Sequence, residues 1–201
     1  MQILFLLNFA CTVPSPSYSG HGTYSYMAFD GERSWQYQNE SEDYSLIVEK
    51  TDYDLTDGVE TITFEYSKKD PQEYLGSITW SAGTAEGIGI VAYATASEEI
   101  ELDSMLIFAK TRMIPGDIIE STSNGNGFEA SLVGVETVSN NWSAEDWETL
   151  HFEVNATTEG TGVPLIGDFW MANGWGPSRF TVSEGPWASE GDWVLSQANW
   201  E

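Results

Sequence analysis

SLIVEKTDYDLTDGVETITFEYSK, residues 45–68, predicts a β-hairpin, and this hairpin sets the fold class of the whole chain. Two runs rich in β-branched and aromatic residues, 45–53 and 60–68, flank a turn that contains Asp57-Gly58, a strong hairpin signal. In the second run, polar residues at 61, 63 and 65 alternate with apolar residues at 62, 64 and 66. Successive side chains of a strand point to opposite faces, so one face of this hairpin is expected to be buried and the other wet.

The same pattern continues along the chain after the hairpin. Turn signals such as Pro115-Gly116 and the run SNGNG at 123–127 recur at spacings of about 10–14 residues. The one helix candidate is the short segment 143–150, where Ser143 could cap. We therefore predict an all-β fold, a curled antiparallel sheet or open half-barrel with few or no helices, with a β-sandwich as the alternative. The further strand runs are 74–83, 87–96, 101–111, 117–122, 128–138, 148–158, 169–176, 179–185 and 192–200.

The first eleven residues suggest export. MQILFLLNFA is apolar and is followed directly by Cys11, the only cysteine, although the basic n-region of a secretory signal is missing. Three interpretations stay open: a lipoprotein signal after which Cys11 is acylated, a secretory signal that is cleaved without acylation, or a first β-strand with a buried thiol. The predicted organisation is a signal or lipoprotein-signal remnant over 1–11, a Pro/Ser/Gly-rich tether over 12–27, and a single β domain over 28–201.

Charge narrows the choice of partners. The chain has 32 acidic and 7 basic residues, a net charge of −25. Phosphate binding requires clustered Lys and Arg, so nucleic acid is excluded as a partner, and contact with a membrane is expected only through the lipid anchor. Solubility is the simplest consequence of such a charge.

Common catalytic devices are missing from the sequence. The chain has two histidines, His21 in the predicted tether and His151 on the predicted solvent face of a strand. Nucleophile-elbow, zinc, P-loop and CxxC motifs do not occur. A hydrolase built on two carboxylates remains an alternative, because 32 acids will always supply some pair at a suitable separation.

Calcium is the one metal that the sequence suggests. Asp52, Asp54 and Asp57, followed by Gly58, supply hard oxygen ligands within one turn. The pattern departs from an EF-hand loop because Thr56 stands at the fifth position and no glutamate stands at the twelfth. A solvated hairpin loop is the competing interpretation, and no cofactor is expected otherwise.

Tryptophans in the last third provide a second candidate site. Trp170, Trp175 and Trp187 could form an exposed platform that stacks on sugar rings, as in a secreted carbohydrate-binding module. The alternative is that they close the end of an open barrel or cover the core, since strands accept aromatic residues readily.

The order of several short motifs resembles that of a broad class of uncharacterised bacterial exported lipoproteins. Their first strand, with the pattern G-x-x-W-x-Y, is similar to AFDGERSWQYQ (28–38). Their late strand-turn-strand resembles GDFWMANGWGPSRFTVS (167–183), and their closing strand resembles DWVLSQANW (192–200). The resemblance implies a curled antiparallel sheet, such as a half-barrel like that of the periplasmic lipoprotein carriers. It implies no activity and no catalytic residues.

The leading hypothesis from the sequence is a non-enzymatic, monomeric protein of the cell envelope. It would be exported to the periplasm, outer membrane or cell surface, lipid-anchored at Cys11, and either structural or able to bind a small apolar ligand in its concave face. A large apolar hollow would favour ligand binding, whereas a filled interior would oppose it.

Overall fold

The computed structural model describes residues 21–84, 87–143, 145–157, 166–185 and 187–200. These residues form one antiparallel sheet of twelve strands, a separate two-stranded ribbon and one turn of 3₁₀ helix, η1 (Tyr24–Tyr26). No helix in the described ranges is long and apolar enough to cross a membrane. The strands are β1 His21–Gly22, β2 Arg33–Gln38, β3 Ser45–Thr56, β4 Val59–Lys68, β5 Glu73–Thr84, β6 Gly87–Thr95, β7 Glu99–Ala109, β8 Arg112–Met113, β9 Ile118–Ser123, β10 Asn126–Val138, β11 Trp147–Ala156, β12 Ile166–Ala172, β13 Gly176–Glu184 and β14 Gly191–Trp200.

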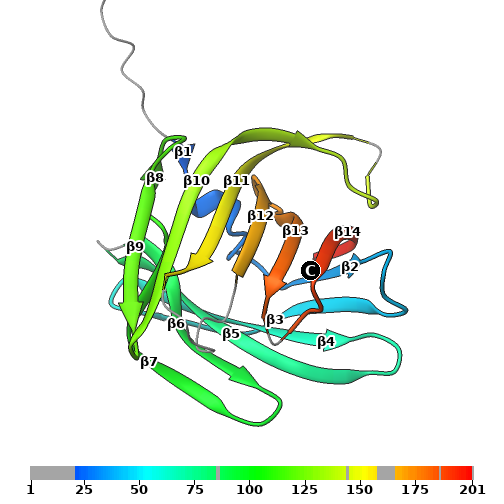
Figure 1. Ribbon diagram of the computed structural model, residues 1–201, viewed down its shortest axis with the longest axis horizontal. Helices are drawn as coiled ribbons and strands as arrows, with labels where there is room; N and C mark the ends of the chain where they lie inside the picture. The colour runs from blue at the N-terminus through cyan, green and yellow to red at the C-terminus, as the bar shows by residue number, and fades with distance from the viewer. Residues whose placement is uncertain (1–20, 85–86, 144, 158–165, 186, 201) are drawn as a thin grey trace, which may run out of the picture.

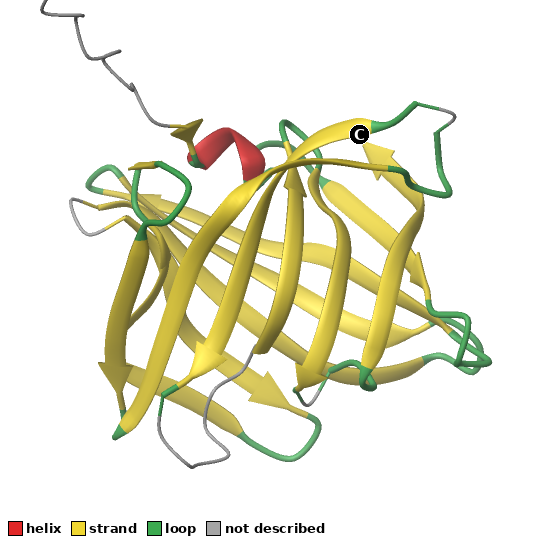
Figure 2. Ribbon diagram, turned by 45° about the horizontal axis from the view of Figure 1, so that its top comes forward, coloured by secondary structure: helices red, strands yellow, loops and turns green. Residues whose placement is uncertain are grey.

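The sheet is made of two meanders of consecutive hairpins, β2 to β7 and β9 to β14. Its strand order is β7-β6-β5-β4-β3-β2-β14-β13-β12-β11-β10-β9, so the meanders join where β2 pairs with β14. The sheet curls round a single interior until β7 and β9 face each other (Figures 1 and 2). The prediction of an all-β fold with a curled antiparallel sheet is confirmed, and the two packed sheets of the alternative sandwich do not form.

The hairpin of residues 45–68 has the predicted turn. β3 and β4 pair from Leu46↔Lys68 to Thr56↔Val59, and the two turn residues adopt left-handed conformations, with φ of 53° at Asp57 and 81° at Gly58. Two successive positive φ angles characterise the tight turn whose twist matches that of the strands it joins. Along β4, Ile62 and Phe64 are buried, as the alternation predicts.

The edge strands β7 and β9 meet through side chains. Ser104 N donates to Ser123 Oγ at 3.2 Å, Ile107 N donates to Ser121 Oγ at 2.9 Å, and Ser104 Oγ donates to the carbonyl of Thr122 at 2.6 Å. Short hydroxyl side chains thus take the place of a backbone ladder along this seam.

Asp103 anchors one end of the seam. Its Oδ1 accepts hydrogen bonds from Asn124 N at 2.9 Å and from Ser123 Oγ at 2.8 Å. These hydrogen bonds lower the pKa of the Asp103 carboxyl below its ordinary value, and the bond from the Asn124 amide has the largest effect. Inside the seam, the Phe108 ring packs against Phe152 with 4.8 Å between centroids.

The N-terminal boundary of the fold lies earlier than predicted. Tyr26 and Met27 are buried in the core, and the Thr23 hydroxyl donates to the carbonyl of Lys110 at 2.5 Å. Residues 21–27 therefore belong to the folded domain and not to the predicted tether 12–27. The physical reason is that two apolar side chains gain burial at the open end of the sheet, which outweighs the flexibility expected from the preceding Gly and Ser residues.

The seam generates the first prediction. Asp103→Asn removes the anionic acceptor, so we expect a lower Tm and several-fold faster amide exchange at Ser104, whose amide bonds to Ser123. Glu120→Gln makes the same charge change on the exposed face of β9 and serves as the control. Equal exchange rates in the two variants at pH 6 would contradict the anchoring role of Asp103.

Candidate functional site

The interior of the curled sheet contains an apolar cavity of about 70 Å³. Its walls come from both meanders and from the segment that precedes β2, and none of the described residues that line it is charged. The lining residues are Met27, Phe29, Trp35, Tyr37, Val48, Phe64, Tyr66, Trp80, Phe108, Phe169, Met171, Pro177 and Phe180.

The two aromatic residues of β2 show how the wall is positioned. Trp35 and Tyr37 lie two residues apart, so both point inward, and both are buried. Trp35 Nε1 donates to the carbonyl of Trp175 at 2.8 Å, and the Tyr37 hydroxyl donates to the carbonyl of Pro177 at 2.8 Å. Burial raises the pKa of the Tyr37 hydroxyl well above its ordinary value. The polar tips are thereby satisfied and the apolar ring surfaces face the cavity.

The segment before β2 closes one end of the interior. Phe29 is 1% exposed and packs against Phe64 and Trp80, with ring centroids at 6.1 and 6.5 Å. Lys50 Nζ donates to the carbonyls of Phe29 at 2.7 Å and Gly31 at 2.8 Å, which fixes the backbone of this plug. Figure 2 shows η1, in red, at this end of the sheet.

Trp187 closes the opposite end, in the connection between β13 and β14. It is 3% exposed, its Nε1 donates to the carbonyl of Ala94 at 2.9 Å, and its ring lies 5.7 Å from that of Tyr66. Gly76 makes this possible, because a Cβ there would lie 2.1 Å from the Trp187 Nε1. Trp187 is thus a buried plug and not the exposed platform residue that the carbohydrate hypothesis requires.

The size of the cavity limits what it can hold. A cavity of about 150 Å³ lined by Leu, Ile and Phe accommodates benzene, whereas 70 Å³ is less than half of that. The interior is therefore largely filled by side chains, and the remaining space suits a small uncharged group. The large apolar hollow that would favour a bulky ligand is not found in the described part of the sheet.

Trp170 lies on the outer surface with both of its ring faces covered. The imidazole of His151 stacks on one face at 4.5 Å with an interplanar angle of 16°, and the guanidinium of Arg179 lies 5.0 Å from the ring centroid. A sugar ring needs an open indole face to stack upon, so Trp170 cannot serve as predicted without displacing these neighbours.

Trp175 belongs to a different surface, near the turn between β12 and β13. It packs against Trp147 at 5.1 Å and Trp142 at 4.8 Å between ring centroids. The structure thus does not bring Trp170, Trp175 and Trp187 together. Trp142 and Trp147 could not be predicted as partners of Trp175 from the sequence, because that contact depends on how the connection between β10 and β11 folds back.

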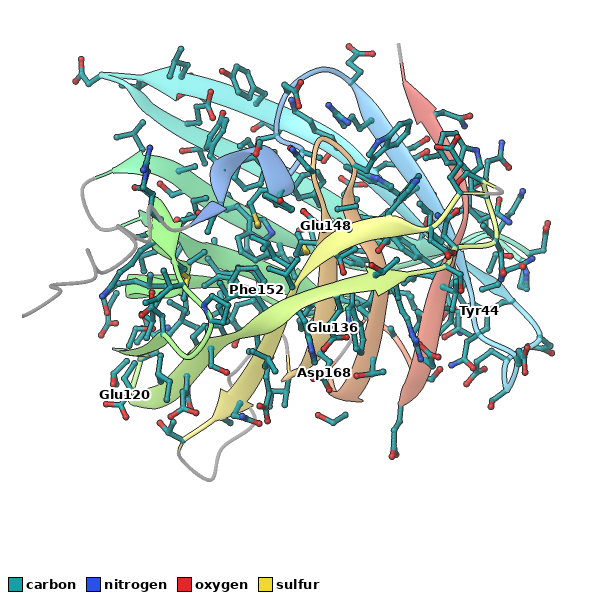
Figure 3. The ribbon with its side chains drawn as sticks, turned by 90° about the horizontal axis from the view of Figure 1, so that it is seen from above. Tyr44, Glu120, Glu136, Glu148, Phe152 and Asp168 are labelled. Carbon is teal, nitrogen blue, oxygen red and sulfur yellow. The ribbon has the colours of Figure 1, made fainter. Side chains whose placement is uncertain are left out.

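The outer surface also carries a cross-strand network centred on His151. Its Nδ1 lies 2.8 Å from Glu136 Oε1 and its Nε2 lies 2.7 Å from Asp168 Oδ1, while Trp170 Nε1 donates to Glu136 Oε2 at 2.8 Å. Figure 3 labels the two carboxylates, Glu136 and Asp168. His151 points away from the core, as predicted, but only 12% of its side chain is exposed. The hydrogen bonds from Trp170 and His151 lower the pKa of Glu136. Sequence spacing gave no signal for this network, which depends on the register of three strands.

The three predicted calcium ligands do not converge. Asp52 Oδ1 accepts from the Tyr53 amide at 2.9 Å, Asp54 Oδ2 accepts from Thr56 Oγ1 at 2.7 Å, and Asp57 occupies the hairpin turn. Within the described residues, no group of three or more His, Cys, Asp or Glu side chains is arranged to hold a metal ion.

Cys11, the predicted lipidation site, lies outside the described residues. Its acylation therefore stays a prediction.

Comparisons with known proteins give two distant structural likenesses. No family model matches the chain, and no curated protein matches it significantly. A "putative lipoprotein" from Parabacteroides distasonis aligns over 87% of this chain and 98% of its own, with 8% identity and a TM-score of 0.46. A "putative exported protein with YmcC-like fold" from Bacteroides fragilis aligns over 84% of this chain and 94% of its own, with 13% identity and a TM-score of 0.43. At these values neither likeness assigns a function to this chain.

The outer network generates a prediction about pH. Because the pKa of Glu136 is lower in the folded protein than in the unfolded chain, its contribution to stability is present above about pH 4.5 and is lost as pH falls through the folded value. Glu136→Gln should lower the free energy of unfolding by less than about 1 kcal/mol at pH 7, since nearly half of this side chain is exposed to screening solvent. Urea unfolding at pH 7 and pH 3 measures this.

Glu145→Gln, an exposed change of the same kind, is the control and should have little effect at either pH. A Glu136→Gln defect that persists undiminished at pH 3 would show that packing, and not the carboxylate, is responsible.

Proposed function

We propose that this protein is an exported, non-enzymatic β domain, anchored by lipid at Cys11, whose interior holds a small apolar group. The observation that carries the proposal is the uncharged aromatic cavity between the two meanders. Export and anchoring are supported by the apolar segment 1–10 directly before the only cysteine.

The chemistry of the cavity wall supports an uncharged ligand. A charged group would lose its hydration in a cavity lined by aromatic, Met, Val and Pro side chains, without gaining a partner. A volume of about 70 Å³ suits a small uncharged group, such as a single xenon atom. Met27 and Met171 give the wall some adaptability, because unbranched thioether side chains change rotamer readily.

Xenon is a suitable apolar probe of the cavity. In wild-type protein, we expect xenon to shift the NMR methyl signals of Met27 and Met171, which line the cavity, but not that of Met113, which is buried outside it. Val48→Phe fills the cavity and should abolish both shifts, whereas Val135→Phe, on a partly exposed side chain, should leave them unchanged. Equal shifts at all three methionines, or none at saturating xenon, would refute the proposed binding site.

The anchor is tested by intact mass. Protein isolated from the membranes of its native host is expected to begin at Cys11 and to carry acyl mass. A soluble form without acyl mass, or a chain that retains Met1, would contradict the anchored assignment and leave the cavity test unaffected.

A further inference from the structure

Exposed aliphatic side chains gather on one outer corner of the sheet. Ile114, Ile118 and Val133 are 40%, 59% and 45% exposed, and the three lie close together. We call these three residues the apolar corner.

Strand register brings the apolar corner together. Ile118 pairs with Ser131, and the backbone of Leu132 forms hydrogen bonds with Gly116 at 2.8 Å and Asp117 at 3.0 Å. Val133 follows at a bulge in β10, directly beside the turn that carries Ile114. Three side chains from a turn, an edge strand and a bulge therefore share one small area of surface.

The chain enters the fold at this corner. β1 pairs with β8 in the register His21↔Met113, so the point where residues 1–20 join the described fold lies beside Ile114. Figure 1 shows β1 and β8 together at one end of β9 and β10. Two bonds from Thr23, its amide to the Thr111 carbonyl at 3.2 Å and its hydroxyl to that of Lys110, fix this entry point.

The length of the tether sets the distance to the membrane. Nine residues, 12–20, separate Cys11 from His21. Fully extended, nine residues span at most about 32 Å. If Cys11 is acylated, as the proposed function holds, the apolar corner lies on the side of the domain that is tied to the bilayer.

Charge at this corner is mixed. Lys110 and Arg112 stand shortly before Ile114 in the chain, while Asp117 Oδ2 accepts a hydrogen bond from the Ile114 amide at 2.8 Å. The aliphatic side chains, and not the charges, therefore carry the proposed contact, and a zwitterionic headgroup such as phosphatidylcholine is the suitable lipid surface.

We propose that the apolar corner docks on the surface of the membrane to which Cys11 is anchored, and so fixes the orientation of the domain. Three aliphatic side chains give weak binding alone. The tether makes the contact effectively intramolecular, which raises the local concentration of the lipid surface far above that for free protein. This inference rests on the proposed anchor, and its test is built so that the two can fail separately.

The test uses the full chain, with the Cys11 thiol coupled to a maleimide lipid in phosphatidylcholine nanodiscs that contain spin-labelled phosphatidylcholine. Coupling replaces biological acylation, so the result does not depend on whether the host lipidates Cys11. We expect the NMR methyl signals of Ile114, Ile118 and Val133 to lose at least twice as much intensity as those of Leu55, an exposed residue of the β3–β4 hairpin.

Ile118→Ser combined with Val133→Ser should remove the excess broadening at Ile114. Leu55→Ser, the matched exposed control, should retain it. Equal broadening at Ile118 and Leu55 in the wild type, or broadening at Ile114 that survives the double substitution, would overturn the proposal. Signals of the apolar corner that shift with protein concentration before any lipid is added would identify a second copy of the chain as the occupant instead.

Discussion

Closure of the curled sheet depends on the side-chain seam between β7 and β9. An edge strand presents unpaired backbone groups, which are a liability in water because they can pair with another chain. Here the backbone amides of Ser104 and Ile107 donate to the hydroxyls of Ser123 and Ser121, respectively. Asp103 fixes the end of the seam by accepting a hydrogen bond from Ser123. The seam keeps Phe108 against Phe152 in the interior, so the cavity and its plugs depend on it.

Local pattern was sufficient to predict the strands but not how the sheet closes. Alternation along 60–66 and the turn at Asp57-Gly58 depend on residues next to one another, and both predictions are confirmed by the structure. The seam depends on serines of β9 whose hydroxyls accept hydrogen bonds from backbone amides of β7. A run of Ser and Thr residues looks the same in sequence whether its side chains make such bonds or face solvent.

The positions of the tryptophan side chains were the least predictable feature, because whether an indole is buried or exposed depends on tertiary contacts. Trp170, Trp175 and Trp187 look alike in sequence, yet one is sandwiched between His151 and Arg179 outside the sheet, and one is a buried plug. Gly76 decides the second outcome from more than a hundred residues away, by leaving room for the Trp187 indole.

The pairing of β2 with β14 has a consequence for the order of folding. Gln36 and Ser196, which share a hydrogen bond, are 160 residues apart, whereas every other neighbouring pair in the sheet is joined by a hairpin or short connection. Each meander can begin to form as soon as its own hairpins have been synthesised, but their union waits for the last strand and bears the entropic cost of the longest loop in the chain. In a chain made from its N-terminus, the two meanders therefore stay unjoined until β14 has been synthesised.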